Sequence, residues 1–204
     1  MNYFSPFLVG FLAAFIGLLA PSMLNMTSAK TSIEKGKKDG ILFSLGAASV
    51  VFIQGFVAVF FAKQLIENPD IISKLKIAAI FVLTGLAIFF FIQAKKKFDA
   101  KTKQRKYGSF STGVTLSSLN MLAVPFYLAM ATFAESKGWM PIEFPFSIIY
   151  VFGAVFGAFS LFSLYAVFAV FIAERVQFIA KNINYILSAL FISLAAFTAT
   201  QVLL

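Results

Sequence analysis

The stretch ILFSLGAASVVFIQGFVAVFFA, residues 41–62, decides the fold, because it contains no charged side chain over its whole length. About 20 apolar residues in an α-helix cross the hydrocarbon core of a bilayer. Further apolar blocks fill most of the 204-residue chain, which is 60% hydrophobic and only 12% charged. The sequence therefore predicts an all-α integral membrane protein with six transmembrane helices. The predicted spans cover residues 6–27, 40–62, 75–94, 109–134, 144–173 and 180–203.

The positive charges lie mainly in alternate connectors. Of the 17 Lys and Arg residues, 13 fall in the connectors after the first, third and fifth predicted spans. The positive-inside rule places these connectors in the cytoplasm and both termini outside. We interpret the basic run KKKFDAKTKQRK, residues 95–106, as charge that sets this topology and meets anionic lipid headgroups, rather than as a nucleic-acid site.

Two residue types that often act in catalysis and metal binding are absent from the sequence. The chain has no Cys and no His, which excludes thiol chemistry, a His proton relay and the usual transition-metal ligands. No charged residue lies in the middle of a predicted span, where it would be the first candidate for function. We therefore expect no enzyme, no cofactor and no bound metal.

The long basic connector divides the chain into two halves. Residues 1–94 and residues 109–204 each carry three predicted spans, and residues 95–108 join them in the cytoplasm. Because three is odd, the second half enters the membrane from the opposite side. This arrangement predicts two inverted three-helix repeats, in which transporters hold their substrate at the interface between the halves.

The first span of each half is interrupted by polar residues. GLLAPSMLNM, residues 17–26, brings Pro21 and Asn25 into the first span, and the fourth span contains Asn120 and Pro125. Proline breaks the helical ladder, and lipid tolerates the freed carbonyls only where protein or a cavity surrounds them. Broken helices at matching places in two halves predict a transport site. Alternatively, the same residues could form hydrogen bonds that hold neighbouring helices together.

The predicted site is polar but carries no charge. We expect Asn25 and Asn120 to face each other near the midplane and to bind the substrate, while Pro21 and Pro125 break their helices. A broken helix offers N–H groups to a carboxylate and carbonyls to an ammonium, so a neutral or zwitterionic solute suits this site. The further lining candidates are Ser22, Ser117, Tyr127 and Gln54.

Small residues recur on two other spans. Gly40, Ser44 and Ala48 repeat every four residues on the second span. Gly153, Gly157 and Ser160 lie on nearly one face of the fifth. Such faces let helices approach closely, so we expect helix packing there. The same faces would also allow two packed helices to slide against each other.

Two stretches resemble the lysine exporter (LysE) family of amino-acid exporters. The stretch PSMLNMTSAKTSIEKGKKDGILFSLG, residues 21–46, is similar to the first-span motif and the basic connector that follows it. The stretch FSTGVTLSSLNMLAVPF, residues 110–126, is similar to the fourth span. A weaker similarity covers KNINYILSALFI, residues 181–192. The matching residues are Pro21, Asn25, Gly36, Gly40, Gly46, Gly113, Asn120 and Ala123.

The resemblance implies export of amino acids or similar small metabolites from the bacterial cytoplasm. Together with the uncharged site, it leads us to expect a secondary transporter in the bacterial cytoplasmic (inner) membrane that exports a neutral amino acid or a similar small polar metabolite. The chain departs from the family where Val51 replaces an Asp and Leu122 replaces a Lys. These departures leave open a rival interpretation, a membrane protein of the same fold that binds lipid or a partner subunit without transport. The expected partners are a small-molecule substrate and the bilayer, with no nucleic acid, and a homo-oligomer is left open.

Overall fold

The structure is a computed structural model that describes residues 3–67, 108–120 and 122–175, together with short pieces between 80 and 92 and between 185 and 200. The described residues form helices and contain no strand. The chain divides into two compact units, Met1–Ile66 with Lys106–Arg175, and Glu67–Arg105 with Val176–Leu204.

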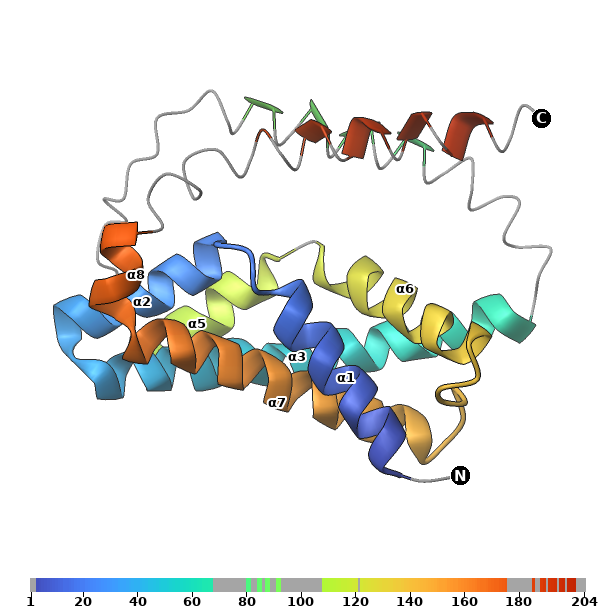
Figure 1. The fold of residues 1–204 in the computed structure, drawn as a ribbon, viewed down its shortest axis with the longest axis horizontal. Coiled ribbons are helices and arrows are strands. Elements are labelled where there is room, and N and C mark those ends of the chain that lie inside the picture. The colour runs from blue at the N-terminus through green and yellow to red at the C-terminus, as the bar shows by residue number, and fades with distance from the viewer. Residues whose placement is uncertain are drawn as a thin grey trace. The chain divides into compact units, whose positions relative to one another are not determined.

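Two long helices form the frame of the first unit (Figure 1). Helix α3 runs over Lys37–Glu67 and α7 over Phe146–Val167, and both are long and apolar enough to cross a membrane. The remaining helices of this unit are shorter. They are α1 (Phe4–Gly17), α2 (Met23–Lys35), α5 (Ser109–Ser118), α6 (Ala123–Ser136) and α8 (Ala169–Arg175).

Helices α5 and α6 have the length and composition of a broken span or of a re-entrant loop. Their axes differ by 68° across a short break, and together they pass the same test of length and hydropathy. The described residues thus supply two or three spans. The predicted total of six is not confirmed, because the blocks at residues 75–94 and 180–203 lie mostly outside the described residues.

The first predicted span is also divided. Its apolar part is α1, and residues 18–22 separate α1 from the more polar α2. Helix α2 then turns sharply into α3 at Gly36, whose φ of 98° is a left-handed conformation that favours glycine. Figure 1 shows that α1 followed by α2 runs in the opposite direction to α5 followed by α6.

Glycines bring two helix pairs into close contact. A Cβ at Gly10 would overlap the Tyr150 carbonyl, and one at Gly153 would overlap the Phe7 carbonyl, so α1 and α7 touch through their backbones. Helices α5 and α3 meet in the same way, because a Cβ at Gly113 would overlap the Phe43 carbonyl. This confirms the expected close packing at Gly153 and extends it to a second pair of helices.

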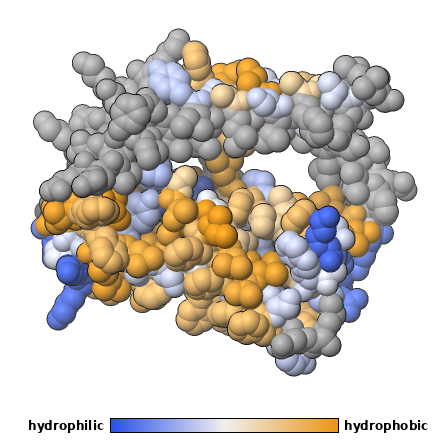
Figure 2. All heavy atoms as spheres, in the orientation of Figure 1, coloured by the Kyte–Doolittle hydropathy of each residue, from blue (hydrophilic) through white to orange (hydrophobic). Residues whose placement is uncertain are grey.

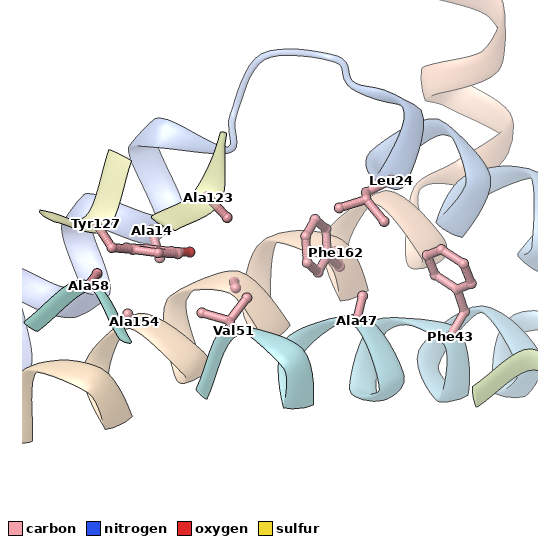
Figure 3. Packing of buried hydrophobic residues seen from close by; sticks show 11 residues of the cluster. Ala14, Leu24, Phe43, Ala47, Val51, Ala58, Ala123, Tyr127, Ala154 and Phe162 are labelled. Carbon is pink, nitrogen blue, oxygen red and sulfur yellow. The ribbon is translucent and has the colours of Figure 1, made fainter. Parts of the chain in front are cut away.

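A mostly apolar core joins these helices around small side chains (Figure 3). Ala14 of α1, Ala47 and Ala58 of α3, and Ala154 and Ala158 of α7 are all buried there. Figure 2 shows that hydrophobic side chains dominate one face of this unit and that the most hydrophilic ones gather at its ends. An apolar belt between polar ends is the surface expected of a protein embedded in lipid.

The second unit is described only in short pieces. Within it, the Ser188 hydroxyl donates a hydrogen bond of 3.0 Å to the Ala87 carbonyl. The rings of Phe91 and Tyr185 meet edge to face with centroids 6.4 Å apart. The third and sixth predicted spans therefore contact each other.

Candidate functional site

The break between α1 and α2 exposes three successive carbonyls, and side chains bind all of them. The Asn25 amide nitrogen donates to the Leu18 carbonyl at 2.6 Å and to the Ala20 carbonyl at 2.9 Å. The Tyr165 hydroxyl of α7 donates to the Leu19 carbonyl at 2.9 Å. An unpaired buried carbonyl costs about 1–3 kcal/mol, so these bonds make the break tolerable inside a membrane.

The neighbouring residues hold Asn25 in this position. Ser22 is the N-cap of α2, and its hydroxyl accepts a 3.4 Å hydrogen bond from the Asn25 backbone N–H. Pro21 lies in the break, and its ring excludes a helical hydrogen bond to the Gly17 carbonyl. The Asn25 side chain is 0% exposed, and its Oδ1 has no hydrogen-bond partner.

The break between α5 and α6 is capped by a side chain from α3. The Gln54 amide nitrogen donates to the Ser117 carbonyl at 2.9 Å, and the Asn120 backbone N–H donates to the same carbonyl at 3.0 Å. Because carbonyls only accept, the oxygen of the Gln54 amide points away from this bond. Gln54 is 8% exposed, and its Oε1 has no hydrogen-bond partner.

Asn120 and Pro125 occupy different positions from their counterparts in the first break. Asn120 lies within the break, where its carbonyl accepts a 3.3 Å bond from the Ala123 N–H. Pro125 lies in the first turn of α6, where a missing N–H is harmless. Its ring excludes the carbonyl four residues earlier, so a continuous helix cannot run through this point.

Tyr127 places a third unpaired oxygen in the apolar core. The residue is 1% exposed, and its hydroxyl has no hydrogen-bond partner. In Figure 3 the hydroxyl points toward the middle of a cluster that includes Ala14, Ala123 and Val51. The Tyr150 hydroxyl donates to the Tyr127 backbone carbonyl at 3.1 Å, which ties α7 to α6.

Unpaired buried polar atoms are rare in folded proteins and call for an explanation, often a water or a ligand. Among the described residues, four buried side-chain atoms have no partner, and the fourth is the Ser163 hydroxyl of α7. Two of them belong to Asn25 and Gln54, the amides that cap the two breaks. Both unpaired amide atoms are acceptors, so the group that would complete them must donate hydrogen bonds.

The structure links some of the predicted residues and leaves others apart. Gln54 bonds to Ser117, and Ser22 bonds to Asn25, but no hydrogen bond joins Asn25 to Asn120 among the described residues. The predicted substrate contacts stay predictions. Sequence analysis missed Tyr165, because nothing in the order of residues indicates that a tyrosine 146 positions away caps Leu19.

The described residues combine helices that are long and apolar enough to cross a membrane with helices that break inside apolar stretches, and transporters build their sites on such breaks. A family model described as LysE type translocator matches residues 15–202 of the chain. The chain therefore belongs to the LysE type translocator family, whose members are membrane translocators of amino acids or related metabolites rather than enzymes. No curated protein and no solved structure matches the chain.

Proposed function

We propose that the chain is a secondary transporter that exports a neutral amino acid or a similar small polar metabolite across the bacterial cytoplasmic membrane. The observation that carries this proposal is the pair of helix breaks, each capped by an amide side chain whose oxygen remains unpaired. A transporter needs such polar, uncharged groups inside the membrane to replace the water around its substrate.

Two inverted repeats of three spans, with both termini outside, would explain how the breaks come together. In the first unit, the first predicted span packs on the fifth through Gly10 and Gly153, and the fourth packs on the second through Gly113. If the two halves are exchanged, the contact between the first and fifth spans becomes the contact between the fourth and second spans. The opposite directions of the two broken spans in Figure 1 agree with this symmetry.

The substrate would lie between the breaks and use the unpaired oxygens. The Asn25 Oδ1 and Gln54 Oε1 atoms accept hydrogen bonds, which suits a substrate ammonium, and the Tyr127 hydroxyl can donate or accept. The positive end of the α6 helix dipole would favour a substrate carboxylate. Asn120, Ser22 and Ser117 would complete the lining.

Alternating access would follow from the glycine contacts. Because α1 meets α7, and α5 meets α3, through backbone atoms rather than interlocked side chains, one half can rock against the other. The buried Ser28 hydroxyl lies 3.0 Å from the Ser44 hydroxyl and donates to the Phe162 carbonyl at 2.9 Å. These bonds hold α2 against α3 and α7 and would have to change if the cytoplasmic side opens.

Tyr127→Phe separates a substrate site from ordinary packing. The variant loses only a buried hydroxyl that has no partner, so its stability should stay unchanged or rise by up to about 1 kcal/mol. If the hydroxyl binds the substrate, transport should fall about tenfold, the effect of losing about 1.4 kcal/mol of binding. Thermal unfolding in detergent and efflux from proteoliposomes measure the two effects.

The matched control is Tyr150→Phe, which removes a hydroxyl that does have a partner. It should lower stability by about 0.5–1.5 kcal/mol through the lost bond to the Tyr127 carbonyl, and transport should persist. Undiminished transport by Tyr127→Phe would remove this hydroxyl from the site. It would leave the assignment of the family untouched.

A further inference from the structure

A pocket lies at the junction of α2, α7 and α8, and no residue of the two helix breaks lines it. It has a volume of about 350 Å³, and residues from both sides of the α7–α8 junction line it. Its walls are mostly apolar and include Ile33, Val167, Phe168 and Val170. Ile33 is 52% exposed, so this apolar lining is open at the surface.

One end of the pocket is positively charged. Lys37 is the single charged residue in its lining. Lys35 and Lys38 flank it on the turn between α2 and α3, and both are exposed. The two acidic groups next to this turn are engaged elsewhere, because Glu34 pairs with Lys30 at 3.8 Å and Asp39 accepts a hydrogen bond from Ser109. Lys37 makes no ion pair within the described part of the chain.

The predicted topology puts this pocket at the cytoplasmic membrane surface. The turn at Gly36 belongs to the first basic connector, and Arg175 ends α8 at the start of the fifth. Both connectors are cytoplasmic by the positive-inside rule. An apolar cavity with a lysine at its rim, at the depth of the headgroups, matches an amphiphile with a negative head and an apolar tail.

We propose that this pocket binds an anionic phospholipid of the cytoplasmic leaflet. The lipid phosphate pairs with the Lys37 ammonium, and the first part of an acyl chain lies against Ile33, Val167 and Phe168. The pocket volume lies near the lower end of the range for small-molecule sites, which begins at about 300 Å³. The pocket is therefore large enough for a segment of a lipid but not for a whole lipid molecule. A bound lipid would bridge α2 and α8. The proposal is independent of the transported substrate.

The test compares lipids on the purified full-length protein after delipidation. Native mass spectrometry counts the lipid adducts retained when phosphatidylglycerol or phosphatidylcholine of the same acyl chains is added. One well-placed lysine at an anionic headgroup is worth about 1 kcal/mol, so the native protein should prefer phosphatidylglycerol about fivefold. Lys37→Gln should abolish that preference, and Ile33→Trp should do so by filling the pocket without changing the charge.

Lys38→Gln is the matched control, because it removes the same charge from the same turn outside the pocket lining. It should keep at least half of the preference. Equal losses in Lys37→Gln and Lys38→Gln would mean general attraction to a basic surface and would overturn the site. A native protein that does not distinguish the two lipids would overturn it as well.

Discussion

Replacement of Asn25 with leucine is expected to destabilise the protein by about 2–4 kcal/mol and to abolish transport. The variant removes the side-chain donors of the Leu18 and Ala20 carbonyls, and a carbonyl left unpaired away from water costs about 1–3 kcal/mol. The net effect lies below the largest sum, because a chain unfolded within lipid also finds partners for its polar groups. The free energy of unfolding in bicelles and efflux from proteoliposomes measure the two losses.

Asn25→Asp separates the capping role from a role in substrate binding. The carboxyl group has nearly the shape of the amide but offers no N–H group. Burial favours its protonated form, whose single O–H can cap only one of the two carbonyls. We expect it to destabilise the protein, by less than leucine does. Native-like stability in Asn25→Asp would show that the hydrogen bonds to Leu18 and Ala20 do not hold the break together.

The second large effect is expected at the contact between α1 and α7. Gly153→Ala adds a Cβ that would overlap the Phe7 carbonyl, and a backbone group cannot move aside as a side chain can. Overpacking of this kind costs about 1–3 kcal/mol, and we expect the upper end of that range. The shift in the midpoint of thermal unfolding in detergent measures the loss.

Gly55→Ala is the matched control on α3. Its Cβ would lie 3.3 Å from a methyl group of Val151, which can adjust by rotation. The gain of about 1 kcal/mol from replacing a helical glycine should offset this contact, so the variant should remain close to native stability. If Gly153→Ala is equally harmless, α1 does not pack on α7 through its backbone.

The length of the apolar blocks in the sequence predicted the positions of the long helices well. The apolar blocks at residues 40–62 and 144–173 correspond to α3, and to α7 with α8. A continuous run of apolar residues leaves few alternatives, because such a segment must become helical in lipid. The break at residues 18–22 was also predictable, since Pro21 cannot continue a helix there.

The partners of the break carbonyls were not predictable from the sequence. Gln54 and Ser117 are 63 positions apart, and only the packing of α5 on α3 brings them together. Sequence reasoning therefore treated Asn25 and Gln54 as substrate ligands, while their amide nitrogens cap backbone carbonyls and only their oxygens remain unpaired. A polar residue in a span indicates that a partner is needed but does not say which one.

The two departures from the family motifs fall in different surroundings. Val51, which replaces an acidic residue, is buried among Ala14, Tyr127 and Ala154, where an apolar side chain fits the core. Leu122 ends the second break as the residue before α6. The absence of both charges is consistent with an uncharged site.

Efflux from proteoliposomes tests the central claim most directly. Liposomes with the purified protein are loaded with a panel of labelled amino acids, and efflux is measured with and without an imposed potential and pH gradient. Tyr127→Phe, which should fold normally, and the double variant Asn25→Leu/Asn120→Leu are measured beside the native protein. The proposed function predicts selective, gradient-dependent efflux that falls in Tyr127→Phe and disappears in the double variant. Efflux no faster than from empty liposomes, for every amino acid and gradient, would contradict transport and favour a protein that binds lipid or a partner subunit.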